Sequence, residues 1–206
     1  MTVEHAVVYR LAALLLEYPD EELVGQLPQL RRVVGSLGEP FARQFSGVLD
    51  HLESGPLLEL AATYVETFDL RRRCCLYLTY YAYGDTRKRG IALLSFKQAY
   101  RAAGVDLAAD ELPDHLCVAL EFAATADSEA GRRLLLEHRA GLEVLRLALM
   151  DAGSPYAGAV AAVCATLPRL AGPDREAVAR LAASGPPAEE VGLEPFAPPE
   201  PTGARR

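Results

Sequence analysis

The sequence lacks the short motifs that mark the common catalytic and phosphate-binding sites. It contains no Gly-rich phosphate loop, no HExxH zinc motif, no GxSxG nucleophile motif and no cysteine and histidine at the spacing of a nucleophile pair. Its four histidines are scattered along the chain. Enzymatic chemistry therefore has little support here, and we predict a protein that is not an enzyme and has no metal or cofactor of its own.

Cysteine is also scarce, and long apolar runs are missing. The four cysteines form no CxxC pair, so neither a disulfide framework nor a zinc site is predicted. The apolar run near the N-terminus, LAALLL, has six residues and is followed at once by acidic residues, unlike a signal peptide or a membrane span. We therefore expect free thiols, a cytoplasmic location and no membrane-spanning segment.

Positive charge is in deficit over the whole chain but not along all of it. The net charge is −7 and the isoelectric point is near 5.2, which argues against a nucleic-acid partner. Residues 64–103, however, hold eight Lys or Arg against three Asp or Glu, a net charge of +5 that leaves −12 for the rest. The sequence predicts a basic site in an acidic body.

The spacing of apolar residues, with proline at helix starts and glycine at helix ends, predicts an all-α protein. We expect one single-domain helical bundle of about eight to ten helices over residues 1–183. The expected helices include about 3–17, two short helices within 20–37, helices opened by Pro40, Pro56 and Pro155, one helix over about 128–150, and a last one from Pro173. Residues 184–206 hold six prolines and three glycines, which predicts a disordered C-terminal tail.

Residues 69–84 have strand-like propensity but no partner strand in the sequence. Because a lone strand is not stable, we expect a loop and then a short helix near 76–83 that ends at Gly84. Asp85 or Thr86 would cap the helix that follows.

Tyrosine and arginine are concentrated in the stretch YVETFDLRRRCCLYLTYYAYGDTRKRGIALL, residues 64–94. It holds five of the nine tyrosines and two basic triplets. Tyrosine and arginine together are typical of recognition surfaces. The alternative is that the tyrosines belong to the core and the arginines to a solvated loop, although Tyr80, Tyr81 and Tyr83 cannot all face one core.

A second stretch, ELPDHLCVALEFAA at residues 111–124, starts with two acidic residues around a proline. On spacing alone it is a helix start, with Asp114 near the positive end of the helix dipole and His115 packed. The spacing of Asp114, Val118 and Glu121 would then place two carboxylates on one helix face.

The two stretches together resemble the respiratory nitrate reductase assembly chaperones, the NarJ or delta-subunit family, which belongs to the TorD/DmsD-like helical chaperones of molybdenum enzymes. The resemblance covers about residues 10–150, and its E-x-P-D-H form is matched by Glu111, Pro113, Asp114 and His115. It implies a TorD/DmsD-like bundle and a groove that binds a leader or N-terminal segment of a client. The residues expected to line that site are Tyr80, Tyr83, Asp85, Arg87, Glu111, Pro113, Asp114, His115 and Glu121.

The resemblance also implies the partners. The client would be the N-terminal peptide of the nitrate reductase catalytic (alpha) subunit, held as apoprotein until the molybdenum cofactor is inserted and before assembly at the membrane. Molybdenum cofactor delivery proteins are further candidate partners. The alternative from another class is a helical acid/base or metal-dependent enzyme that uses Asp114, His115 and Glu121, and a third is a general interaction module built on the basic segment.

Overall fold

The computed structural model describes residues 2–108 and 111–185 of the chain, and in this part the only strand-like feature is one isolated bridge. The α-helices of the described residues are α1 (Val3–Leu15), α2 (Glu21–Gly35), α3 (Phe41–Leu52), α4 (Leu57–Tyr64), α5 (Leu78–Tyr83), α6 (Arg87–Ala102), α7 (Leu116–Thr125), α8 (Ser128–Glu137), α9 (Arg139–Asp151), α10 (Ala157–Thr166) and α11 (Gly172–Ser184). A π-helical turn, Val65–Asp69, continues α4, and a 3₁₀ turn covers Arg72–Cys74.

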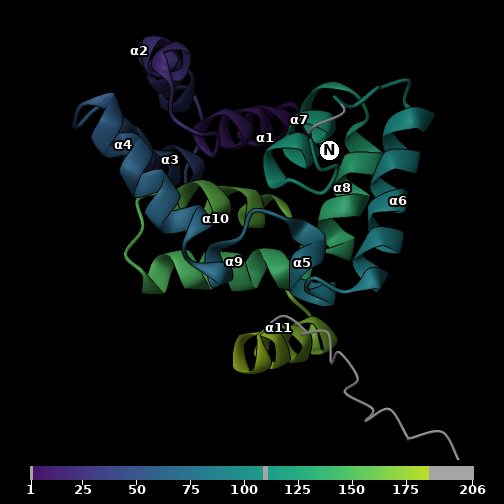
Figure 1. Cartoon of the computed structure of the whole chain (residues 1–206). Coiled ribbons are helices and arrows are strands. Elements are labelled where there is room, and N and C mark those ends of the chain that lie inside the picture. Colours follow the sequence, from purple (N-terminus) through teal and green to yellow (C-terminus); the bar gives the residue numbers. More distant parts are fainter. Residues whose placement is uncertain (1, 109–110, 186–206) are drawn as a thin grey trace, which may run out of the picture.

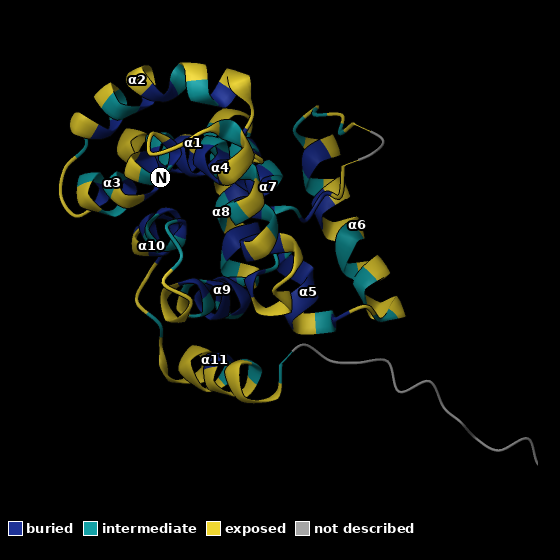
Figure 2. Cartoon of the chain, turned by 60° about the vertical axis from the view of Figure 1, so that its left-hand side comes forward, coloured by how far each residue is buried: buried dark blue, intermediate teal, exposed yellow. Residues whose placement is uncertain are grey.

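The helices pack around one apolar core, with α9 and α10 in the middle of the array (Figure 1). α10 packs against α1, α3 and α9, and α7 packs against α1 and α8. α5 contacts both α6 and α9, and α11 covers the outer side of α9. Figure 2 shows that α9 and α10 are largely buried, whereas α11 is exposed along most of its surface.

The predicted all-helical class is confirmed, and two helix boundaries differ from the prediction. Glu21–Gly35 form one helix across Pro28. The proline removes one intrahelical hydrogen bond, but the helix continues because its buried face, with Leu23, Leu27 and Leu30, packs on the core. The single helix predicted over 128–150 is instead two helices, and the described residues therefore contain eleven α-helices rather than eight to ten. His138 separates α8 from α9, and its ring packs on Phe96 of α6 at 5.2 Å between centroids.

The short helix predicted near 76–83 is present as α5, and Gly84 ends it with φ of 54°, a conformation that favours glycine. The last helix, α11, extends through Ser184, one residue past the predicted domain end. The predicted tail lies outside the described residues from position 186 onward. Across residues 2–108 and 111–185, no helix combines the length and the apolar character needed to span a membrane.

Candidate functional site

The two stretches singled out in the sequence meet through the isolated antiparallel bridge. The amide of Leu78 donates a hydrogen bond to the carbonyl oxygen of Asp114 at 3.0 Å, and the amide of Leu116 donates one to the carbonyl oxygen of Leu76 at 2.8 Å. A two-residue bridge has no sequence signature of its own, but it holds residues 76–78 and 114–116 side by side.

Asp114 is fully buried at this junction, with 0% of its surface exposed. Its Oδ2 accepts two hydrogen bonds from Thr79, one from the amide at 3.1 Å and one from the hydroxyl at 2.5 Å. The guanidinium of Arg89 lies 3.6 Å from the same oxygen. A buried carboxylate needs such partners, and here α5 and α6 supply them.

The prediction that Asp114 lies in the first turn of a helix is wrong. α7 begins at Leu116 and His115 is its N-cap residue, because the bridge between Tyr77 and His115 holds His115 in an extended conformation. Asp114 and Glu121 therefore do not share a face of one helix. The acid/base or metal-dependent alternative depended on that shared face and loses its basis.

Arg89 contacts Asp114, Thr79, Tyr77 and Tyr80, and we call these five residues the Arg89 cluster. The side chain of Arg89 is only 17% exposed. Its Nε donates a hydrogen bond to the Thr79 hydroxyl at 3.2 Å. Its guanidinium carbon lies 5.3 Å from the ring centroid of Tyr77 and 6.0 Å from that of Tyr80, within the range of cation–π attraction. Arg89 thus ties the aromatic stretch to the buried carboxylate.

The predicted tyrosines are less accessible than a recognition surface requires. Tyr80 is buried, with 7% of its surface exposed, and its hydroxyl accepts a hydrogen bond from Nε of Arg72 at 3.1 Å. Tyr83, at the end of α5, is half-buried. Of the two predicted tyrosines, Tyr83 is the one whose ring offers surface to a partner.

Asp85 and Arg87 lie at the exposed start of α6. Thr86 occupies the N-cap position, and no side-chain hydrogen bond caps the helix, so Asp85 is not a cap. Asp85 instead pairs with Arg89 at 3.4 Å and with Arg72 at 3.6 Å. It links the buried cluster to the molecular surface.

His115 faces the aromatic stretch, with its ring edge-to-face against Tyr77 at 5.3 Å between centroids. Burial lowers the pKa of His115 from its ordinary value, and the neighbouring Asp114 carboxylate opposes part of that shift. The imidazole is therefore neutral at neutral pH.

The remaining predicted residues, Glu111, Pro113 and Glu121, lie in or next to a pocket between α1 and α7. Pro113 is buried, and its carbonyl oxygen accepts a hydrogen bond from the hydroxyl of Tyr100 at 2.6 Å. Glu111 and Glu121 line a pocket of about 270 Å³ between α1 and α7, together with apolar residues that include Val118 and Phe122. The structure thus separates the nine predicted residues into a cluster around Arg89 and a groove with an acidic rim.

The groove between α1 and α7, called here the acidic groove, also contains groups that the sequence prediction missed. Arg10 of α1 pairs with Glu121. The Glu17 carboxyl also lines the groove, and burial followed by the negative charges of Glu111 and Asp20 raises its pKa. Carboxylates from just after α1 and from the region around α7, which are distant in the sequence, therefore surround one apolar opening.

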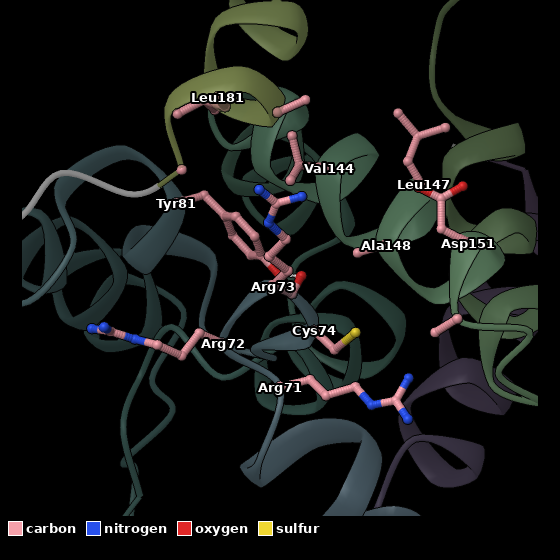
Figure 3. Close-up of a pocket in the computed structure, with 13 residues that line it drawn as sticks. Arg71, Arg72, Arg73, Cys74, Tyr81, Val144, Leu147, Ala148, Asp151 and Leu181 are labelled. Carbon is pink, nitrogen blue, oxygen red and sulfur yellow. Dashed lines mark hydrogen bonds between the residues drawn. The ribbon is translucent and has the colours of Figure 1, made fainter.

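A second pocket, of about 430 Å³, lies between α9, α11 and the 3₁₀ turn that carries the first basic triplet. Its apolar lining includes Tyr81, Val144 and Leu181. Figure 3 shows the side chain of Arg73 turned toward Tyr81 and Val144. We call this opening the basic groove.

The most central residues of the Arg89 cluster, Thr79 and Arg89 itself, were not among the predicted site residues. Thr79 interrupts an aromatic and apolar run, and a hydroxyl in a buried helix needs a partner, which was the available signal. Arg89 is the third member of a basic triplet, and only the tertiary structure distinguishes it from its neighbours. In the described ranges, no group of three or more His, Cys, Asp or Glu side chains is placed to hold a metal ion.

Comparisons with known proteins agree with this architecture. A family profile described as "Nitrate reductase delta subunit" matches residues 34–162. The "Nitrate reductase-like protein NarX" of Mycobacterium tuberculosis (strain ATCC 25618 / H37Rv) is 45% identical over 160 residues, which cover 78% of this chain and 24% of NarX. This chain therefore spans about a quarter of the length of that relative.

A relative that is matched over most of its length and a solved structure are also similar to this chain. The "Probable nitrate reductase molybdenum cofactor assembly chaperone NarJ" of Bacillus subtilis (strain 168) is 31% identical over 172 residues, covering 82% of this chain and 92% of NarJ. A solved structure from Archaeoglobus fulgidus, described as a candidate redox enzyme maturation protein, matches with a TM-score of 0.57. It covers 81% of this chain and 93% of its own, and its 22% identity supports the fold alone.

Proposed function

The chain belongs to the nitrate reductase delta subunit family, and from this premise we propose that it binds the N-terminal segment of the apo form of a nitrate reductase catalytic (alpha) subunit. Binding would hold that subunit while the molybdenum cofactor is inserted and before assembly at the membrane. In this role the chain is an assembly chaperone and not an enzyme. Molybdenum cofactor delivery proteins would act on the bound client.

The acidic groove is the observation that carries the proposal. It joins an apolar lining to carboxylates from the residues just after α1, from the segment before α7 and from α7 itself. An amphipathic segment can lay its apolar side chains along such a groove, in the helix-in-groove mode, while its basic side chains meet the carboxylates. The apolar contacts supply affinity, and the charges fix orientation.

The Arg89 cluster positions the segment before α7, which borders the acidic groove, and its exposed neighbours offer the client a second contact area. Tyr100 packs on Phe122 in the groove wall, with 4.6 Å between ring centroids, and its hydroxyl holds the carbonyl of Pro113. The buried Asp114 then fixes the segment that precedes α7 against α5. We propose that Tyr83, Asp85, Arg87 and His115 form the outer part of the client surface and that Tyr80 and Asp114 act by positioning it.

Calorimetric titration with a synthetic peptide tests the proposal. The peptide would carry the N-terminal residues of the nitrate reductase catalytic subunit from the same source. Replacing a carboxylate that pairs with a charged group typically costs about 1.5 kcal/mol or more. Glu111→Gln is therefore expected to weaken peptide binding by roughly tenfold, and Glu121→Gln to weaken it as well.

Glu59→Gln is the matched control, because Glu59 is exposed on α4 and lines neither groove. It should leave the affinity unchanged. Absence of binding by the unmodified chain would contradict the proposal, and equal affinity in all variants would move the client site away from the acidic groove.

A further inference from the structure

The basic groove is lined by α9 and α11, which lie away from the α1 and α7 helices of the acidic groove (Figure 1), and the proposed client site does not use it. Its apolar lining consists of Val144, Leu147 and Ala148 from α9, together with Leu181 from α11. Leu147 is 36% exposed although it is a large apolar residue. The groove thus leaves apolar surface open next to a row of guanidinium groups.

The three arginines of the groove differ in their partners. Arg71 pairs with Glu66 at 2.7 Å, and Arg72 pairs with Asp85 and donates a hydrogen bond to the Tyr80 hydroxyl. The guanidinium of Arg73, by contrast, has no hydrogen bond or ion pair with any described residue, although Figure 3 shows it turned into the groove. An exposed carboxylate, Asp151, lies on the α9 side of the pocket.

Gly185, the last described residue of the chain, lies at the edge of this groove. Gly185 directly follows α11 and lines the same pocket. The chain continues for 21 residues beyond it, and residues 186–200 hold four glutamates and no basic residue. Glu189 and Glu190 come first, and Leu193 and Phe196 supply apolar side chains.

Reach and charge both favour this segment over a separate partner. Four residues span at most about 14 Å, so Glu189 lies within that distance of Gly185, which itself lines the pocket. A segment tethered at the edge of its site has an effective concentration in the millimolar range. Docking on Arg73 and the apolar lining with a dissociation constant below about 1 mM is therefore enough to keep the groove mostly occupied.

We propose that residues 189–196 of this chain, EEVGLEPF, dock in the basic groove as an internal ligand, with a glutamate of the pair 189–190 on Arg73 and the apolar side chains on α9 and Leu181. The inference does not depend on the identity of the client, because it rests on a different surface.

The absence of tryptophan from the chain makes a direct test possible. F196W in the full-length chain introduces one tryptophan, which reports only on this segment. We expect its emission to be shifted to shorter wavelength relative to the same chain in denaturant, and its quenching by acrylamide to be several-fold weaker. Adding R73E should abolish both effects, and adding E189R and E190R to R73E should restore them.

Controls keep the test decisive. R175E changes an exposed arginine on α11 that does not line the groove, and it should leave the emission unchanged. L193W serves as a second reporter in case the larger ring at position 196 does not fit. Solvent-exposed emission from both reporters would overturn the proposal, and so would a blue shift that grows with protein concentration, since the segment of a second copy would then fill the groove.

Discussion

Asp114 holds the two parts of the site together through partners on α5 and α6. Its carboxylate accepts both hydrogen bonds of Thr79 and faces Arg89, and none of these groups has full access to solvent. Removing a buried carboxylate leaves its donors and its cation unpaired, which costs more than the net value of the interactions themselves.

We therefore expect Asp114→Ala to lower the free energy of unfolding by roughly 2–4 kcal/mol. Asp114→Asn, which keeps the shape and one acceptor, should cost less. Urea denaturation followed by circular dichroism measures both, with Asp85→Ala as the exposed control whose ion pairs are long and solvated. If Asp114→Ala unfolds at the urea concentration of the unmodified chain, the cluster does not hold these elements together.

His138 gives the chain a predictable response to acid. Burial lowers its pKa from 6.5 to about 4. The unfolded chain therefore binds more protons between these values, so stability is fully present above pH 6.5 and falls as the pH drops toward 4. For a partly exposed ring we expect this group to contribute roughly 2 kcal/mol of the loss.

The measurement compares the unmodified chain with His138→Gln in urea titrations at pH 7.0 and pH 4.5. Carboxylates also titrate in this range, but they are common to both proteins and cancel in the difference. The variant should lose less stability on acidification than the unmodified chain. Equal losses would show that His138 is protonated in the folded protein.

Two buried contacts of single residues could not be predicted from the sequence. The residue types of the E-x-P-D-H motif indicated a functional segment, but no pattern in the sequence indicates that Asp114 is buried against Thr79. That contact joins residues 35 positions apart through a two-residue bridge, and so short a pairing leaves no periodic pattern. The buried ion pair of Arg139 and Glu143 was missed for a different reason. A charged pair four residues apart on a helix is usually exposed, so its spacing does not indicate burial.

At the scale of helices, the fold depends on close approaches that only glycine permits. Gly158, at the start of α10, faces α3, and a Cβ atom there would overlap the backbone carbonyl oxygen of Gln44. Backbone atoms cannot move aside as the tip of a side chain can. The two helices would have to separate, and the buried surface between them would be lost.

Gly158→Ala is therefore expected to destabilise the chain by about 1–3 kcal/mol or more. Gly47→Ala is the matched control, because Gly47 lies in α3 with open space around it and should gain up to about 1 kcal/mol from the better helix propensity of alanine. Thermal unfolding of the two variants should shift in opposite directions. A stabilised Gly158→Ala chain would contradict the packing of α10 on α3.

The helices were predictable to the extent that local signals define them. Proline before α3 and α4, glycine after α5 and the apolar spacing of α1 correctly located those elements. The exceptions are Pro28, across which α2 continues because its buried face packs on the core, and the break at His138, whose ring packs against Phe96 of α6. Both depend on tertiary contacts and not on the local sequence.

At the scale of the whole molecule, the basic and acidic residues of the sequence line two separate grooves. The basic stretch contributes the arginines of one groove, while glutamates from distant segments surround the other. The sequence indicated a basic site in an acidic body, but it did not indicate the acidic groove, whose rim combines Arg10 and Glu17 with Glu111 and Glu121. Only folding brings those side chains together.

The central claim is that the client segment binds across the acidic groove and the outer residues of the Arg89 cluster. Hydrogen exchange of the full-length chain, with and without saturating client peptide, tests it most directly. We predict that the peptide slows exchange in residues 111–125, in the facing part of α1 and at the start of α6, while α2 and α3 are unaffected. Slowed exchange confined to α9 and α11, or no change at any position, would contradict the account.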